Sequence, residues 1–326
     1  MRIHLQNPAD DKLFRFSQPM WDAAVARAPD IGAGHRVSIG ETAEDFAAGM
    51  AQAEALISDT DTIRALFPVS APNLQLISVT SAGLDGLAPF GWLPPGVSLL
   101  NNSGTHADKA GEFALMAVLM LANRIPEFVT DQRQGLWRKR WGSVLRGRRV
   151  TVVGLGSLGG AAAKRFSQFA MHVTGVRTRA EPHPHCAEVV ATGDLDRVLA
   201  TTEFLLLACP LTPATRNLID RRRLGLLPAG SGLINIGRGA LLDQDALCNA
   251  LEAGALGGAV LDVFVPEPVA PGHRLWTTPN LIMSPHISAD DPNTYNADSL
   301  DIFLENLRAR RDGRKMPNFF DAQRGY

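Results

Sequence analysis

The 326-residue chain has few cysteines, almost no net charge and no long apolar run. Its three cysteines, Cys186, Cys209 and Cys248, are too few and too widely spaced for a disulfide framework, which favours a reducing compartment. A net charge of −1 argues against nucleic-acid or acidic-membrane partners. The longest apolar run, residues 114–122, is too short to cross a bilayer, and the first residues lack a signal peptide's apolar core. We therefore expect a cytoplasmic protein without nucleic-acid or membrane partners.

What the chain does have is a glycine-rich stretch, VTVVGLGSLGG, at residues 150–160. A β-branched apolar run precedes three glycines, and an Ala-rich helical pattern follows them, which is typical of a dinucleotide-binding turn. Gly154 permits the sharp turn, Gly156 lets the backbone approach a pyrophosphate, and Gly159 lets helix and strand pack closely. Ser157 and Leu158 complete the motif at the start of the helix, where unpaired N–H groups attract an anion. The alternative is a purely structural turn.

Strand and helix patterns alternate along the whole chain, which predicts two α/β domains with doubly wound parallel sheets. In the first part we expect a helix at 41–53 and strands at 35–39, 55–58 and 74–79. The nucleotide domain should contain six strands, at 150–153, 172–176, 204–208, 232–236, 258–263 and 281–283. A last helix at 293–310 should return to the first domain. The predicted boundaries are 1–103 with 290–326 for the substrate-binding domain and 104–289 for the dinucleotide-binding domain.

The end of the second strand of the nucleotide domain, HVTGVRTRAE, bears on the choice of cofactor. NAD-binding units usually place an acid here, which hydrogen-bonds the ribose 2′-hydroxyl. This chain has Arg177, Thr178 and Arg179, a hydroxyl between two guanidiniums that suits a 2′-phosphate. We therefore predict that NADP(H) is preferred and that NAD(H) remains possible. The alternative is that these arginines simply face water.

Three polar residues follow three successive strands of the same domain. Arg238 lies in INIGRGALLD, Glu267 in LDVFVPEP and His286 in MSPHIS. Because ligands of open α/β sheets bind outside the carboxyl ends of the strands, we expect these side chains to gather at one edge. There Arg238 can bind a substrate carboxylate and polarise the carbonyl, and His286 can donate a proton to the carbonyl oxygen. Glu267 can hold the imidazole and favour its charged form. Taken singly, each residue would more often be structural.

In combination, these motifs resemble those of the D-2-hydroxyacid dehydrogenase family, especially its NADPH-using glyoxylate/hydroxypyruvate reductases. Further matching stretches are TSAGLDGL, NNSGTHADKAGEFAL and CPLTPATRNLID. The resemblance implies a Rossmann domain inserted into a flavodoxin-like domain, a homodimer paired through the nucleotide domain, and the catalytic set Arg238, Glu267 and His286. It places Ser81, Ala82 and Gly83 with Arg238 and His286 at the substrate. It implies a larger set of cofactor-binding residues: Cys209, Pro210, Thr215, Ile236, Gly237, Arg238, Asp262, His286 and Ser288.

Three features remain open at this stage. Trp137 and Trp141 in a basic segment indicate either an oligomer arm or a surface loop with one tryptophan tucked in. His183, His185 and Cys186 lack further ligands, so we expect a solvated loop and no metal site. Asp290 and Asp291 depart from the family pattern and leave the substrate range open.

The function predicted from these motifs is the reduction of a small 2-oxo acid. The alternative is a nicotinamide-responsive dimeric binding protein of the corepressor type.

Overall fold

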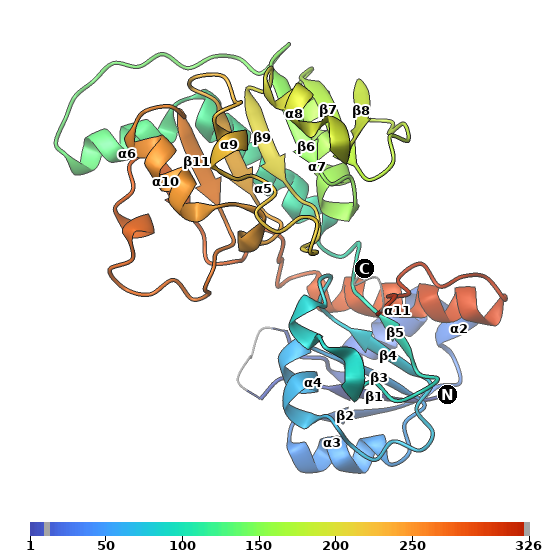
Figure 1. Ribbon diagram of the computed structural model, residues 1–326. Helices are drawn as coiled ribbons and strands as arrows, with labels where there is room; N and C mark the ends of the chain where they lie inside the picture. The colour runs from blue at the N-terminus through green and yellow to red at the C-terminus, as the bar shows by residue number, and fades with distance from the viewer. Residues whose placement is uncertain (10–13, 323–326) are drawn as a thin grey trace. The chain divides into compact units, whose positions relative to one another are not determined.

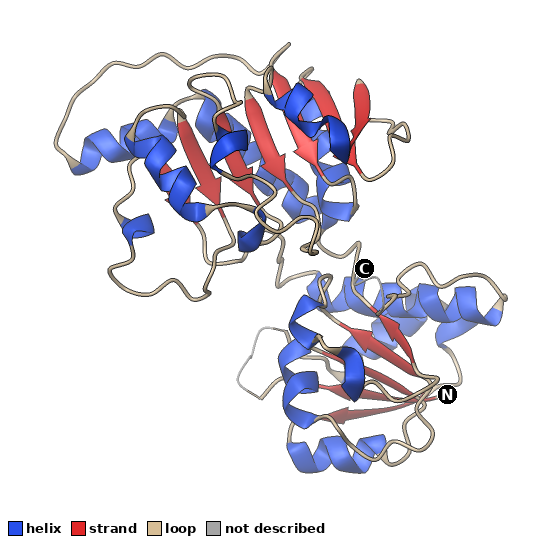
Figure 2. Cartoon of the chain, viewed as in Figure 1, coloured by secondary structure: helices blue, strands red, loops and turns tan. Residues whose placement is uncertain are grey.

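The computed structural model describes residues 1–9 and 14–322, which form two compact α/β units (Figures 1 and 2). The first unit is Met1–His106 with Asp291–Tyr326, and the second is Ala107–Asp290. The boundaries between the units therefore lie between residues 106 and 107 and between residues 290 and 291, where we expected 103 and 104 and 289 and 290. Residues 323–326, at the end of the expected substrate-binding domain, lie outside the described residues.

The described part of the first unit is a parallel five-stranded sheet between two layers of helices. The strand order β2-β1-β3-β4-β5 is the doubly wound order of flavodoxin-like folds. Its strands are β1 (Arg2–Gln6), β2 (Arg36–Gly40), β3 (Ala55–Ser58), β4 (Leu76–Val79) and β5 (Ser98–Leu100). Its helices are α1 (Gln18–Arg27), α2 (Pro29–Gly32), α3 (Ala43–Met50), α4 (Thr60–Leu66) and α11 (Tyr295–Arg311), with 3₁₀ turns η1 (Asp85–Leu87) and η2 (Phe90–Trp92).

Two apolar cores cover the two faces of this sheet. One contains side chains of α1, α2 and α11, including Trp21, Ile31 and Phe303. The other contains side chains of α3 and α4, including Phe46 and Ile63. Helix α11 therefore completes the first unit from the far end of the chain, as its position in Figure 1 shows.

The described part of the second unit has a parallel seven-stranded sheet in the order β12-β11-β10-β9-β6-β7-β8. Counted along the chain, this is the Rossmann order 3-2-1-4-5-6 with one added strand. The strands are β6 (Arg149–Val153), β7 (His172–Arg177), β8 (Glu188–Ala191), β9 (Phe204–Leu207), β10 (Gly232–Asn235), β11 (Gly258–Leu261) and β12 (Leu281–Met283). The helices are α5 (Ala107–Ala122), α6 (Ile125–Arg133), α7 (Ser157–Gln168), α8 (Leu195–Leu199), α9 (Arg221–Leu224) and α10 (Gln244–Glu252), with 3₁₀ turns η3 (Thr192–Asp194), η4 (Gly239–Leu241) and η5 (Arg274–Trp276).

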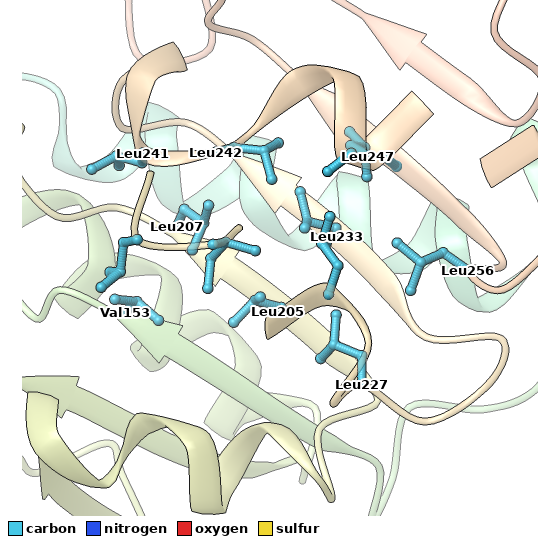
Figure 3. Packing of buried hydrophobic residues seen from close by; sticks show 14 of the residues in the cluster. Val153, Leu205, Leu207, Leu227, Leu233, Leu241, Leu242, Leu247 and Leu256 are labelled. Atoms are coloured by element: carbon cyan, nitrogen blue, oxygen red, sulfur yellow. The ribbon is translucent and has the colours of Figure 1, made fainter. Parts of the chain in front are cut away.

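Each face of the larger sheet buries its own core. Side chains of α5 and α7, such as Ala114 and Phe166, pack on one face. Side chains of α8, α9 and α10 pack on the other, where Leu205, Leu233 and Leu247 lie close together in Figure 3. Burial on both faces leaves the strand ends as the places where polar side chains can meet a ligand.

The structure corrects the number of strands in both units. Strands β1 and β5 add to the three that we expected in the first part, and β8 makes seven strands in the described second unit instead of six. The stretch after Pro89, expected as an irregular connection, includes the short turn η2. Across the described residues, no single helix is long and apolar enough to cross a membrane, although α5 and α6 together, bent by 64°, pass that test by length and composition.

Candidate active site

The glycine turn between β6 and α7 is shaped by two close backbone approaches. A Cβ on Gly159 would lie 1.8 Å from the carbonyl oxygen of Gly154. Gly154 has φ +94°, and its Cβ would lie 2.6 Å from the Cα of Cys209. A Cβ on Gly156, in contrast, would meet no atom within 4 Å, so the space before the first turn of α7 is open. Open space in front of a helix N-terminus fits the pyrophosphate of a dinucleotide.

The order of the sheet reverses beside this turn, between β6 and β9. Ligands of doubly wound sheets bind at such a reversal. Cys209 and Pro210 follow β9 there, and burial raises the pKa of the Cys209 thiol to about 11. Thr215 shapes this loop, because its hydroxyl accepts from the Thr212 amide and donates to the Pro210 carbonyl, each at 2.7 Å. Direct cofactor contacts of Cys209, Pro210 and Thr215 remain predictions.

The end of β7 carries the expected cationic residues, but Arg177 already has a partner. Its guanidinium lies 2.7 Å from a carboxylate oxygen of Glu181, four residues on. Thr178 and Arg179 are exposed. Glu181 was not among the predicted site residues, because opposite charges four residues apart are expected to pair on a helix, and here they lie at a strand end and in the loop after it.

Arg238 follows β10 in a loop held by its own backbone and by Asn235. The Asn235 side chain accepts from the Gly237 amide and donates to the Arg238 carbonyl, at 3.1 and 3.0 Å. An Arg238 guanidinium nitrogen donates to the Gly237 carbonyl at 2.8 Å. A Cβ on Gly239 would lie 2.3 Å from the backbone of Phe264, so this loop packs directly on the loop that follows β11. The sequence analysis missed Asn235, although an amide at a strand end is a known turn former.

Glu267 joins the loop after β11 to the loop after β12. One carboxylate oxygen accepts from the Phe264 amide, and the other lies against Nδ1 of His286, both at 2.7 Å. Gln244 of α10 fixes the intervening segment through two hydrogen bonds with the Val265 backbone. The peptide bonds before Pro266 and Pro268 are cis. The His286 side chain is 50% exposed, so its ring can meet a ligand from solvent while Nδ1 is occupied by Glu267.

Asp262 holds the backbone that presents His286. Its buried carboxylate accepts from the Ser284 hydroxyl and from the amides of Ile287 and Ser288, at 2.6, 3.0 and 3.0 Å. Its carbonyl accepts from the His286 amide at 2.9 Å. His286 has φ +56°, a conformation that costs free energy for residues other than glycine and persists only when its surroundings fix it. Asp262 and Ser288, which we expected at the cofactor, therefore also position the catalytic candidate; Ile236 and Gly237 lie in the buried part of the neighbouring loop.

The loop expected at the substrate follows β4 in the first unit and is partly exposed; it consists of Ser81, Ala82 and Gly83. The Thr60 hydroxyl donates to the Ser81 hydroxyl at 3.0 Å, and the backbone amide of Asn102 donates to the Ser81 carbonyl at 3.0 Å. These contacts fix the loop in its own unit. Its contact with substrate remains a prediction.

The histidine and cysteine side chains after β7 approach one another without forming a metal centre. Cys186 Sγ lies 3.7 Å from His183 Nδ1. Within residues 1–9 and 14–322, no group of three His, Cys, Asp or Glu side chains could hold a metal ion.

Comparisons with known proteins identify the family. The model of the D-isomer specific 2-hydroxyacid dehydrogenase NAD-binding domain matches residues 115–288. The chain is 34% identical to human glyoxylate reductase/hydroxypyruvate reductase over 272 residues, 81% of each chain, and 34% identical to a glyoxylate reductase from Thermofilum pendens, over 71% of this chain and 70% of that one. A D-isomer specific 2-hydroxyacid dehydrogenase from Xanthobacter autotrophicus, solved with NADPH and MES, superposes with a TM-score of 0.79 over 99% of both chains at 28% identity. Together with the glycine turn and the strand-end residues, these matches show that the chain belongs to the D-isomer specific 2-hydroxyacid dehydrogenase family of NAD(P)-dependent oxidoreductases.

Proposed function

We propose that this chain is an NADPH-preferring 2-ketoacid reductase that acts on glyoxylate, hydroxypyruvate or a related small 2-oxo acid. The observation that carries the proposal is the 2.7 Å contact between Glu267 and the half-exposed ring of His286, next to the Arg238 loop. Two of the related enzymes named above are reductases of glyoxylate or hydroxypyruvate. A binding protein of the corepressor type needs no such acid–base pair, which makes it the weaker alternative. Purified protein that bound NADPH but reduced no 2-oxo acid would favour that alternative.

The residues of the second unit account for the chemistry as follows. The glycine turn and the first turn of α7 would hold the pyrophosphate of a reduced nicotinamide dinucleotide, which supplies the hydride when bound. His286 as imidazolium donates its Nε2 proton to the carbonyl oxygen as that oxygen becomes an alkoxide. Glu267 holds the ring through Nδ1 and so orients Nε2. Arg238 binds the substrate carboxylate, and the product is the 2-hydroxy acid.

Arg177 would distinguish the two nicotinamide cofactors. A guanidinium at the end of β7 can pair with a 2′-phosphate and offers nothing comparable to a 2′-hydroxyl. The Xanthobacter autotrophicus relative was solved with NADPH, which supports the same choice here. Arg179 and Thr178 would add a second cation and a hydroxyl at the same strand end.

Arg177→Gln is expected to lower kcat/KM for NADPH by about 10- to 100-fold, since hydrogen bonds to charged groups contribute about 1.5–3 kcal/mol each. The value for NADH should stay within about twofold. Steady-state kinetics with both cofactors measures this, and Arg197→Gln, which breaks the ion pair with Glu188, is the matched control. A preference of the unchanged chain for NADH would contradict the proposal.

We also propose that the chain forms a homodimer through an arm, residues 134–145, and a groove along α5. Trp137 and Trp141 of the arm are 95% and 81% exposed, so neither is tucked in. Arg140 nevertheless ties the arm to the buried carboxylates of Asp131 and Glu127, at 2.9 and 3.0 Å. The groove has a volume of about 710 Å³ and a largely apolar lining: Leu115, Met116, Leu119, Met120, Ile125 and Phe169, with Glu112, Asn123, Arg165 and Gln168. In a two-fold dimer, two such arms and two grooves are used reciprocally.

Replacing both Trp137 and Trp141 by alanine is expected to shift the mass in solution from twice 35.1 kDa to 35.1 kDa. Light scattering after size-exclusion chromatography measures the mass. Trp276→Ala removes another half-exposed indole of the same unit and should leave the dimer intact. A double variant that remained dimeric would exclude the arm from the interface.

A further inference from the structure

The ion pair between Arg177 and Glu181 occupies the group that a 2′-phosphate would need. The two side chains are partly exposed, 33% and 56%, and their charged atoms lie 2.7 Å apart. A phosphate that binds Arg177 must therefore displace the carboxylate or share the guanidinium with it. Any negative charge left on Glu181 then lies near a group that carries nearly two negative charges.

The segment after β7 places this ion pair beside the start of α7. Nε2 of His183 lies 3.3 Å from the position that a Cβ on Gly160 would occupy, so the segment contacts the first turn of the helix. Cys186 Sγ lies 3.1 Å from the corresponding Cβ position of Gly175 in β7. Glu181 thus belongs to a short segment that is packed against α7, the helix that follows the glycine turn, and against β7.

Arg177 carries the positive charge at this segment. Burial lowers the pKa of the neighbouring His183, and the nearby charges of His185 and Arg177 lower it further, so the charged form of this ring is disfavoured. The positive end of the α7 dipole points to the same region. The guanidinium and the helix dipole both favour an anion, and Glu181 is the anion that contacts Arg177.

We propose that Glu181 is a specificity-determining residue: it competes with the 2′-phosphate for Arg177 and so weakens the binding of NADPH without affecting that of NADH. This inference rests on the proposed use of NADPH and adds to it the residue that limits the preference. Glu181 touches neither Glu267 nor His286 in the hydrogen bonds and ion pairs described above, so its effect should lie in cofactor affinity and leave the proton transfer unchanged.

The test is Glu181→Gln, which keeps the size of the side chain and removes its charge. Affinity for NADPH should rise by about 2- to 5-fold, because the guanidinium is released from an exposed ion pair and becomes available to the phosphate. Calorimetry with NADPH, NADH, adenosine 2′,5′-bisphosphate and adenosine 5′-monophosphate measures the effect, which should appear with the two 2′-phosphorylated ligands. The gain should shrink as salt is raised, since exposed charges are screened.

Glu252→Gln is the matched control. Glu252 of α10 pairs with Arg274 of η5 at 3.0 Å, and the two side chains are 48% and 35% exposed, close to the values for Glu181 and Arg177. It should change the affinity for none of the four ligands.

A second variant separates this inference from the proposed cofactor preference. Arg177→Gln alone tests the preference, and Glu181→Gln added to Arg177→Gln should give no further gain if the two residues compete through one guanidinium. A gain that persisted in the double variant would mean direct repulsion of the phosphate and would overturn the competition. An unchanged NADPH affinity in Glu181→Gln would overturn the role of Glu181 while leaving that of Arg177 intact. A loss of NADH affinity would show instead that Glu181 accepts from the ribose hydroxyls.

Discussion

Asparagine in place of His286 is expected to lower kcat for the reduction of glyoxylate or hydroxypyruvate by about 10² to 10⁴-fold, the range for loss of a general acid. The carbonyl oxygen would then gain its negative charge with no proton donor in contact. Binding of NADPH should change far less than kcat, because the glycine turn and the β7 end, which would hold its phosphates, do not involve His286. The half-exposed position of the ring should also let added imidazole restore part of the rate.

Asparagine is the appropriate replacement because of the backbone. With φ +56°, position 286 has a left-handed conformation that asparagine tolerates better than most residues, so the hydrogen bonds to Asp262 can persist. Single-turnover kinetics at saturating cofactor measures the chemical step. His172→Asn makes the same change at the start of β7, at the opposite end of the strands, and should leave kcat unaltered. Near-normal turnover in the His286 variant would remove this residue from proton transfer.

Where strands are continuous apolar runs, the sequence sufficed to place them. Strands β3 and β6 were located to within one residue because both faces of a doubly wound sheet are buried around them. Strand β1 was missed because His4 and Gln6 interrupt its apolar pattern. The structure buries them as a hydrogen-bonded pair, with His4 Nε2 3.0 Å from the Gln6 side-chain oxygen. Strand β5 directly follows a Pro- and Gly-rich stretch, and β8 begins with Glu188 after the Pro-rich segment that follows β7, so neither strand stands out from the loop before it.

The candidate site shows a similar division. Arg238, Glu267 and His286 were predictable because each follows a strand, and parallel strands end at the same edge of the sheet. The residues that position them, Asp262 and Asn235, could not be predicted in that role. They act through backbone groups whose positions depend on loop conformation. Glu181 was overlooked for another reason: the partner of a surface arginine depends on how a loop folds back, and the Pro-rich segment after β7 gives no periodic signal.

In the proposed function Arg238 recognises the substrate, and its replacement should lower activity as much as replacement of His286 does. A carboxylate held by a guanidinium fork accepts two charge-assisted hydrogen bonds, each of about 1.5–3 kcal/mol. Arg238→Gln should therefore lower kcat/KM for hydroxypyruvate by about 10² to 10⁴-fold, with losses in both KM and kcat. Arg238→Lys keeps the charge without the planar fork, so its kcat/KM should lie between those of the unchanged enzyme and Arg238→Gln. Arg221→Gln, at the exposed start of α9, is the matched control.

The decisive comparison uses a substrate without the carboxylate. Glycolaldehyde is hydroxypyruvate without that group, so the unchanged enzyme should reduce it poorly, and Arg238→Gln should not reduce it more slowly still. The ratio of kcat/KM values for hydroxypyruvate and glycolaldehyde should then fall toward one in the variant. Equal losses with both substrates would mean that Arg238 acts on the carbonyl oxygen or on the loop itself, since an interaction with the carboxylate can be lost only when the substrate has one.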